Sequence, residues 1–500
     1  MTQKNNVGAG KLLWWTLAVV ALVRLLTLGM YPLTDTTEAR YAEVARKMVE
    51  LGDWITPWYD YGVPFWAKPP LSTWLTALSL KLFGINEFAA RLPYFLLAVL
   101  IAWLVADWLG RRSKREALLA VAVLSGTMLY FIAAAAVMTD LALVLGTTLA
   151  MRGFWAAFEN VDSPRPKEQW LLFLGLGIGL LAKGPIALVL AGIPIVLWVL
   201  VTGNIVTAWK RLAWLRGSLL MLAIAVPWYW MAEMRTPGFW AYFFIGEHWH
   251  RFTVTGWAGD KYGTAHATTR GAIWLLAVAA CLPWTVLLPA LAFGRKAGLK
   301  AATLAAATKP GLPETFAASK ALVAAKRQRT LYLLAWSVSP CLFFTLSGNI
   351  LWTYVLPALP ALAMLAAAWL AADARTRLVD TVVAAGLLGM ALLVGAFFLK
   401  QQKDDSWKTA KMAVAQYQLL NTDKRPLLLM GDLPYSASFY SQGKAKAVKD
   451  NAELAIRMAQ ERLFVALNPD QVQALTPELK IRLQLEATSG AYSLYSSILN

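Results

Sequence analysis

Cysteine and histidine are scarce in this chain of 500 residues, which contains two cysteines and three histidines. Both cysteines, Cys281 and Cys341, lie inside long apolar runs, so the sequence has no disulfide framework of the kind that small secreted proteins use. Of the histidines, His248 and His250 are two residues apart, and His266 is the third. We therefore predict no metal site, and no other cofactor is expected.

Charged residues are also few, at 15% of the chain, whereas 58% of the residues are hydrophobic and 24 are tryptophan. A soluble core does not need such long uncharged runs, but a run of about 18 residues can cross a hydrocarbon core roughly 30 Å thick. We predict an all-α polytopic membrane protein of about 11 to 13 transmembrane helices. The expected spans are residues 12–30, 92–110, 116–137, 141–158, 169–183, 185–202, 217–233, 271–293, 331–347, 350–372 and 378–399. The adjoining pairs at 116–158 and 331–372 leave room for one or two more.

The positions of Lys and Arg predict the orientation of these spans. The first run carries Arg24 and lacks a small-residue cleavage site, so we expect an uncleaved span rather than a signal peptide. Short basic connections remain on the cytoplasmic side of a membrane. The basic connections here are residues 111–115, 163–167, 209–216, 295–329 and 373–377. With the N-terminus on that side as well, topology explains the formal net charge of +18, and no nucleic-acid partner is expected.

The opposite, outer face receives the segments that are chemically most suggestive. They are residues 31–91, 138–140, 183–185, 235–270 and 347–349, and the tail that follows Lys400. In the tail, apolar stretches alternate with helical patterns, which predicts a small α/β domain. The sequence thus divides into a transmembrane domain at 1–400, with its first outer loop at 31–91, and a C-terminal domain at 401–500.

The first outer loop begins with YPLTDTTEARYAEVARKM, residues 31–48, which contains three acids and three bases. Asp35 and Glu38 have the spacing of a capping box, and Gly52 is a natural C-cap, so we predict a helix from about Thr36 to Leu51. In this interpretation both carboxylates are structural. The alternative, developed from the segments that follow, is that one of them is a catalytic acid or base.

The loop continues with WITPWYDYGVPFWAKPPLSTWL, residues 54–75, in which seven aromatic residues surround Lys68. Lys68 is either an anchor at the membrane surface or the cation of an aromatic-rimmed pocket for an anion. Asp140 stands between apolar segments, where an acid is costly and indicates function, although it could instead cap the helix that follows. Acids near a basic pocket favour acid–base chemistry.

Several of these stretches together carry a resemblance to a known family. They are DTTEARYAEVARKM, GDWITP and FWAKPPLSTWL in the first loop, followed by LLAKGPIALVL, FWAYFFIGEHWHRF, CLPWTVLLP and LFFTLSGNILWTYVLPALPALAML. In order and spacing the set resembles the GT-C membrane glycosyltransferases, in the branch that contains the protein O-mannosyltransferases and the bacterial lipid A 4-amino-4-deoxy-L-arabinose transferases (ArnT). The resemblance covers residues 28–372 and does not extend to the C-terminal tail.

The resemblance implies an inverting transferase that takes a sugar from an undecaprenyl-phosphate donor and passes it to a periplasmic acceptor, lipid A or lipopolysaccharide being the first choice. The protein is then expected in the bacterial inner membrane as a monomer among membrane lipids, with its active site on the periplasmic side. By this resemblance, Lys68 and Tyr354 are expected to bind the donor phosphate, and Asp140 is expected to have an acidic role. Arg251 and Arg270 are further cations on the outer side that could hold the phosphate. The remaining pocket candidates are Arg40, Tyr41, Lys183, Glu247 and His248.

Two positions depart from the family pattern. The family places adjacent Asp and Glu at the start of the loop helix, whereas this chain has Thr37 and Glu38, with the Asp displaced to Asp35. Either Asp35 or Glu38 could therefore be the base, and Asp35 is our first choice. The aminoarabinose transferases also have an acid before the loop lysine, and here that residue is Ala67.

Two alternative functions remain open at this point. A protein or surface-polysaccharide O-glycosyltransferase would use the same carrier lipid and differ only in its acceptor. A lipid or sugar transporter would also have many spans, but it would be expected to show internal repeats and charges within its spans. The two halves of this chain show no convincing repeat, and its charges lie at the outer ends of the spans.

Overall fold

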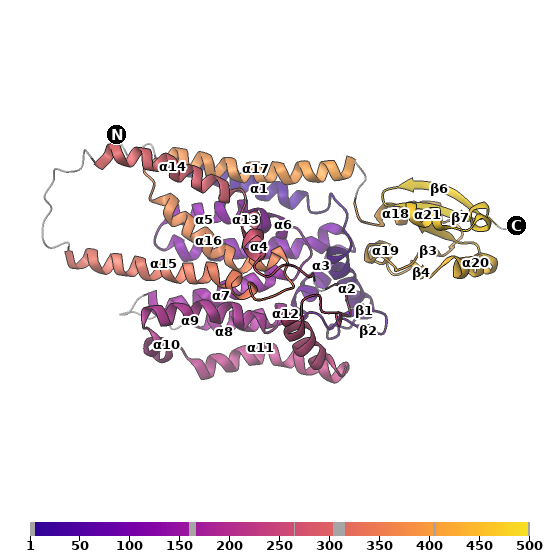
Figure 1. The fold of residues 1–500 in the computed structure, drawn as a ribbon, viewed down its shortest axis with the longest axis horizontal. Helices are drawn as coiled ribbons and strands as arrows, with labels where there is room; N and C mark the ends of the chain where they lie inside the picture. Colours follow the sequence, from indigo (N-terminus) through magenta and orange to yellow (C-terminus); the bar gives the residue numbers. More distant parts are fainter. Residues whose placement is uncertain (1–5, 160–166, 265, 304–315, 404–406, 499–500) are drawn as a thin grey trace.

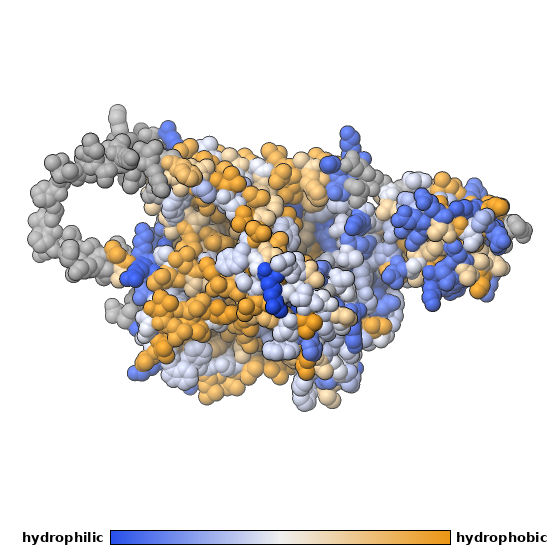
Figure 2. Space-filling view, in the orientation of Figure 1, coloured by the Kyte–Doolittle hydropathy of each residue, from blue (hydrophilic) through white to orange (hydrophobic). Residues whose placement is uncertain are grey.

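A computed structural model describes residues 6–159, 167–264, 266–303, 316–403 and 407–498. The chain forms a large helical body, and a smaller domain built on a β-sheet lies beyond one end of it (Figure 1). We call that end of the body the sheet-domain end. In Figure 2 the helical body presents broad hydrophobic surface, whereas hydrophilic residues are spread over the sheet domain.

The helical body confirms the predicted fold class. Each of the predicted apolar runs coincides with one helix or with two consecutive helices. These are α1 (Asn6–Leu26), α4 (Glu87–Gly110), α5 (Lys114–Gly126), α6 (Met128–Ala133), α7 (Asp140–Glu159), α8 (Trp170–Lys183), α9 (Ile186–Thr202), α11 (Trp214–Arg235), α13 (Ile273–Ala280), α14 (Trp284–Thr303), α15 (Phe316–Phe344), η3 (Trp352–Ala358), α16 (Leu359–Ala371) and α17 (Thr376–Lys403). The short helix α10 (Ile205–Arg211) connects α9 and α11.

Length and composition identify the helices that could cross a membrane. Within the described residues, five stretches are long and apolar enough to cross a membrane alone: α4, α7, α11, α17 and the continuous η3–α16 stretch. The bent pair α13 and α14 would make a sixth, and α8 and α9 are shorter apolar helices. Several predicted spans are therefore short or broken helices, an arrangement that a membrane tolerates where neighbouring helices cover the backbone.

Small residues allow α7 and α8 to pack closely. A Cβ atom added to Gly146 in α7 would lie 2.7 Å from the carbonyl oxygen of Gly175 in α8, so neither position can accept a side chain without moving a helix. Such contacts between small residues are typical of helix pairs in membranes. The two helices are antiparallel neighbours, and they bring Asp140, the first residue of α7, beside Lys183, the last residue of α8.

The first outer loop folds against the sheet-domain end. It contains α2 (Thr37–Leu51), a small hairpin of β1 (Trp58–Asp60) and β2 (Val63–Pro64), and α3 (Leu71–Phe83). The predicted helix is present and Gly52 ends it in the left-handed conformation, but the predicted capping box is wrong. Thr36 is the N-cap residue and its side chain makes no capping hydrogen bond. The side chains of Asp35 and Glu38 instead form hydrogen bonds with residues that are distant in the sequence.

Glu38 is engaged by Arg91 of α4. Arg91 donates from Nε and Nη2 to the two carboxylate oxygens, each at 2.8 Å. Its Nη1 donates to the carbonyl oxygens of Leu28 and Tyr31, and Nη2 also donates to that of Pro32. The Arg91 side chain is fully buried. This ion pair fixes the start of α2 to the helical body.

Removing the Glu38 carboxylate should therefore destabilise the fold. We expect Glu38→Ala to lower the free energy of unfolding by about 3–5 kcal/mol, because it leaves a buried guanidinium without its counter-ion. Denaturant or thermal unfolding in detergent measures the change. Glu50→Ala is the control, since Glu50 is an exposed acid near the other end of α2 and should cost about 1 kcal/mol or less. Equal effects of the two substitutions would contradict the assignment.

The sheet domain begins after α17. Its sheet has the strand order β4-β3-β5-β7-β6. The strands are β3 (Leu427–Met430), β4 (Lys446–Val448), β5 (Phe464–Leu467), β6 (Leu483–Ser489) and β7 (Tyr492–Ser497). The strand β3 is parallel to β4 and β5, whereas β7 is antiparallel to β5 and β6.

Helices cover both faces of this sheet. Leu427 and Leu429 of β3 face α18 (Lys411–Leu420) and α19 (Tyr435–Tyr440), whereas Leu428 faces the other side. That second face is covered by α20 (Asn451–Gln460), α21 (Pro469–Ala474) and α22 (Pro477–Ile481). The domain is therefore a small α/β unit, and its helix α19 packs on α2 of the first outer loop.

Candidate functional site

Charged side chains from distant segments meet at the sheet-domain end of the helical body. The first group contains Asp140, Lys183 and Tyr354. Lys183 donates from Nζ to Oδ1 of Asp140 at 2.6 Å, and Nζ lies 4.9 Å from the centre of the Tyr354 ring. Asp140 is 8% exposed, and the helices α7 and α8 fix its partner. An acid and a cation are thus held together where two spans end.

The second group contains Lys68, Glu247, Arg251 and Asp260. Lys68 donates to Oε1 of Glu247 and to the carbonyl oxygen of its neighbour Ala67. Arg251 donates to both oxygens of Glu247, at 2.9 and 3.1 Å, and to Asp260 at 3.2 Å. Burial favours a higher pKa for Glu247, but the charges of Lys68 and Arg251 outweigh it and hold the pKa below its usual value. Glu247 is therefore ionised and joins the two cations.

A π-helix presents this second group. The segment η1 (Ala241–His250) continues into the short helix α12 (Arg251–Thr253), and π-helical turns are frequent at functional sites. His248 links the two groups, because its Nδ1 lies 2.7 Å from the carbonyl oxygen of Phe243 and its Nε2 lies 3.3 Å from that of Lys183. Burial lowers the pKa of His248, so its ring is neutral at physiological pH.

Arg40, from the first turn of α2, approaches the same region. It donates to the carbonyl oxygen of Tyr262, and its guanidinium lies 5.4 Å from the centre of the Tyr41 ring. Tyr262 belongs to the connection between α12 and α13, where its ring packs on Phe65 and its hydroxyl donates to the carbonyl oxygen of Pro64 at 2.7 Å. Burial raises the pKa of Tyr262 to about 12, so the hydroxyl remains a donor.

The balance of these groups favours an anion. Arg40, Lys68, Lys183 and Arg251 supply four positive charges, against the three carboxylates of Asp140, Glu247 and Asp260. The buried Nε atoms of Arg40 and Arg251 have no hydrogen-bond partner within the described residues. Buried guanidinium groups with unused donors suit a phosphate, which accepts several charge-assisted hydrogen bonds at once.

The other predicted residues lie apart from these groups. Glu38 is occupied by Arg91, and the carboxylate of Asp35 accepts hydrogen bonds from Ser436 of the sheet domain. Burial raises the pKa of Asp35, and the hydrogen bonds from Ser436 only partly oppose this. Arg270 is exposed, and no ion pair joins it to the charged groups in the described part of the chain.

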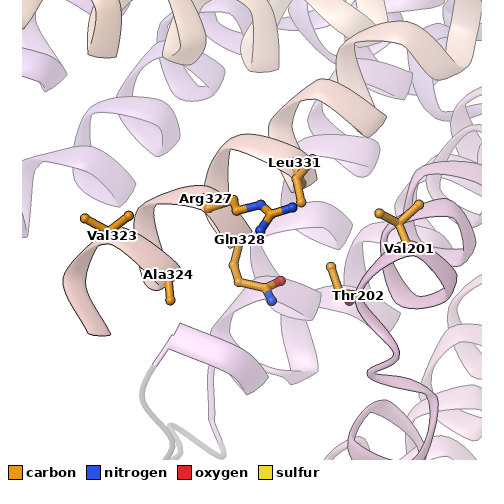
Figure 3. Close-up of a pocket in the computed structure, with 7 residues that line it drawn as sticks. All are labelled: Val201, Thr202, Val323, Ala324, Arg327, Gln328 and Leu331. Atoms are coloured by element: carbon orange, nitrogen blue, oxygen red, sulfur yellow. The ribbon is translucent and has the colours of Figure 1, made fainter. Parts of the chain in front are cut away.

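A cavity at the opposite end of the body contrasts with this site. Figure 3 shows it between the end of α9 and α15, with Arg327 and Gln328 among its lining residues. The remaining lining residues are Val201, Thr202, Val323, Ala324 and Leu331, so the lining has no carboxylate. The length of α9 alone places the cavity about 25 Å from Lys183, at 1.5 Å per residue. Acid–base chemistry is therefore expected at the sheet-domain end.

Comparison with known proteins gives concordant results in sequence and in structure. Residues 14–243 match the family described as dolichyl-phosphate-mannose-protein mannosyltransferase. The undecaprenyl phosphate-alpha-4-amino-4-deoxy-L-arabinose arabinosyl transferase of Edwardsiella ictaluri is 32% identical over 369 residues, which are 71% of this chain and 59% of that protein. The enzyme of the same name from Aeromonas salmonicida is 33% identical over 371 residues, covering 72% and 60%.

The fold comparison extends over nearly the whole chain. The crystal structure of ArnT from Cupriavidus metallidurans bound to undecaprenyl phosphate superposes with a TM-score of 0.73 over 97% of both chains, at 21% identity. The apo structure of that protein gives the same TM-score at 22% identity. This chain therefore has the ArnT fold, and its sequence is similar to that of the ArnT-type members of the GT-C family. It aligns with less than two thirds of the length of the curated relatives named above, so their activity is not transferred to it directly.

The sequence predicts the likeness to the GT-C family, but it does not point to several residues that form or support the site. Asp260 and Tyr262 gave no local signal, because each is a single polar residue in an irregular connection. Arg91, the partner of Glu38, stands at the end of the first outer loop with no motif around it. Ser436 lies in the tail, where the sequence showed no family resemblance. An isolated arginine at the start of a predicted span is the one available signal among these, since it must find a partner.

Proposed function

We propose that this GT-C protein transfers 4-amino-4-deoxy-L-arabinose from an undecaprenyl-phosphate donor to lipid A, with inversion at the sugar. The observation that carries the proposal is the cluster of Lys68, Arg251 and Lys183 beside Asp140, because it combines a phosphate site with a carboxylate. The names of the curated relatives support the sugar and the carrier. A protein or surface-polysaccharide acceptor would use the same cluster.

In the proposed reaction an acceptor hydroxyl oxygen attacks the anomeric carbon of the sugar. The bond between that carbon and the phosphate oxygen breaks, and undecaprenyl phosphate leaves with the electron pair. Lys68, Arg251 and the hydroxyl of Tyr354 bind the phosphate as its negative charge grows. Asp140 takes the proton of the acceptor hydroxyl. Lys183 donates a hydrogen bond to Oδ1 of Asp140 and so fixes the orientation of the carboxylate.

The contacts of the three acids make Asp140 a better candidate for the base than Asp35 or Glu38. Both oxygens of Glu38 are bound by Arg91, and both oxygens of Asp35 are bound by Ser436. Asp140 uses Oδ1 for Lys183, and its Oδ2 has no hydrogen bond to another described residue. A general base needs a free oxygen within hydrogen-bond reach of the proton that it removes.

A direct assay tests the function. The purified protein is given undecaprenyl-phosphate aminoarabinose and lipid A, and the mass of lipid A is followed by mass spectrometry. Growth by one aminoarabinose unit supports the proposal. Parallel reactions replace lipid A by a peptide or an oligosaccharide acceptor. Transfer only to one of these would replace the acceptor, and absence of transfer to all three acceptors would overturn the function.

We also propose that the sheet-domain end is periplasmic and that the membrane is the bacterial inner membrane. The support is the set of basic connections at the opposite end, which short cytoplasmic loops are expected to carry. The test places a single cysteine at exposed Lys449 in the sheet domain, or at exposed Lys326 in α15, after both native cysteines are replaced by alanine. An impermeant maleimide should label only the first in spheroplasts. Labelling only at position 326 would reverse the orientation.

A further inference from the structure

The sheet domain makes hydrogen bonds with the segment from which α2 begins. Ser436 donates from its backbone nitrogen to Oδ1 of Asp35 at 3.0 Å and from its hydroxyl to Oδ2. The backbone nitrogen of Asp35 in turn donates to the carbonyl oxygen of Lys408 at 2.8 Å. The backbone and the side chain of Asp35 are therefore both held by the C-terminal part of the chain.

The same helix, α19, is attached at its other end. The Tyr440 hydroxyl accepts a hydrogen bond from the backbone nitrogen of Leu33 at 2.7 Å and donates to Oε1 of Glu87 at 2.9 Å. Lys411 also pairs with Glu87, at 2.5 Å. These contacts can hold the domain on the helical body without Ser436. The contact between Ser436 and Asp35 can therefore serve a local role in the site.

This local role concerns the residues that follow Asp35 at the start of α2. Arg40 lies in the first turns of α2 and points toward Tyr262 at the charged site. Tyr435, the neighbour of Ser436, forms a hydroxyl–hydroxyl hydrogen bond with Tyr59 of the hairpin. Arg40 is also close to Tyr435: burial raises the pKa of this tyrosine, and the charge of Arg40 partly opposes that increase. One turn of α19 therefore contacts both the start of α2 and the hairpin that precedes Lys68.

We propose that Ser436 is a positioning residue of the transferase site, acting through Asp35 to set the position of α2 and of Arg40. Asp35 is then also a positioning residue, and its carboxylate does not remove the acceptor proton. The proposal rests on the proposed function, because the site that it positions is the transferase site. It gives the C-terminal domain a part in the reaction centre, although that domain contributes none of the clustered charges.

Two matched substitutions test the contact. Ser436→Ala removes the hydroxyl that donates to the carboxylate, and Asp35→Asn replaces the accepting carboxylate oxygen by an amide NH2 group; each keeps the bond from the backbone nitrogen of Ser436. Ser436 also accepts a hydrogen bond from the backbone nitrogen of Ala410, at 2.9 Å, so Asp35→Asn isolates the Asp35 side of the contact. Ser438→Ala is the control, because Ser438 is in the same helix and its hydroxyl makes no hydrogen bond within the described residues.

Kinetics separate positioning from proton transfer. If Ser436 positions the site, each single variant should lower kcat roughly 10- to 100-fold, the scale expected for misplacement of reacting groups. The double variant should be no worse than either single variant, because both substitutions disturb the same contact. A dead Asp35→Asn protein beside a fully active Ser436→Ala protein would overturn the proposal and make Asp35 the base.

Hydrogen exchange supplies a measurement that does not depend on activity. Amides of residues 33–40 should exchange faster in Ser436→Ala and Asp35→Asn than in the wild type or in Ser438→Ala. Unchanged exchange in both test variants would overturn the proposal. If the wild-type protein transfers no sugar in any assay, the proposed function fails, while the exchange experiment still decides whether Ser436 positions α2.

Discussion

Lys68→Ala is expected to abolish measurable sugar transfer and to weaken binding of undecaprenyl phosphate by about 2–5 kcal/mol, the cost of removing one partner of a buried charge pair. Lys68 is the loop cation that touches Glu247, and its backbone is fixed by Pro69 and Pro70, where α3 begins. Removing it leaves Arg251 alone to hold Glu247 and the donor phosphate. Titration of the purified variant with undecaprenyl phosphate measures the binding.

Lys81→Ala is the matched control for this experiment. Lys81 lies in the last turn of α3 in the same loop, with its ammonium group 5.8 Å from the centre of the Trp54 ring. It has the chemistry of an interfacial anchor and lies outside the charged groups, so the variant should retain donor affinity and activity. If Lys68→Ala behaves like Lys81→Ala, Lys68 returns to the alternative role of a membrane anchor.

Asp140→Asn should lower kcat by about 10²–10⁴-fold, the usual contribution of a general base. The substitution keeps the shape of the side chain and an oxygen that can accept from Lys183, so the protein should remain folded. Donor affinity should change little, because Lys68 and Arg251 are untouched. Turnover and donor binding measured on the same preparation separate the two effects.

The other two acids serve as the comparison for Asp140. Asp35→Asn is expected to retain partial activity, and Glu38→Gln should show its effect mainly in stability. If Asp140→Asn is active and Glu38→Gln is inactive, the base is Glu38. If Asp140→Asn is active and Asp35→Asn is inactive, the base is Asp35. All three remaining active would mean that none of these acids removes the acceptor proton.

The helices were predictable because each depends on local information. A long apolar run needs only its own composition to become a membrane helix, and Gly52 needs only its own flexibility to end α2. The start of α2 was not predictable in detail. The capping box failed because Asp35 found Ser436, 401 residues away, and Glu38 found Arg91, 53 residues away. These pairings supply stronger partners than the backbone of the first turn.

The charged site shows the same limit. The sequence identifies four of the charged residues but does not pair them: Lys68, Asp140, Glu247 and Arg251. Lys68 and Glu247 are 179 residues apart, and Lys183 and Asp140 are 43 apart, so each pair depends on how whole segments pack. For Arg270 the only signal in the sequence is its place on the outer side, and that signal does not distinguish an exposed cation from one in the cluster.

The glycine contact between α7 and α8 implies that one half of the site is rigid and the other half moves during the catalytic cycle. Because the backbones meet at Gly146 and Gly175, Asp140 and Lys183 stand on a frame that cannot spread without losing its packing. Lys68, Glu247 and Arg251 come from connections between spans, which can part and close at much lower cost. A bulky lipid donor would therefore enter by displacing the connections that carry Lys68, Glu247 and Arg251, while Asp140 keeps its position. We expect the slow motion of the catalytic cycle to belong to the phosphate-binding half of the site.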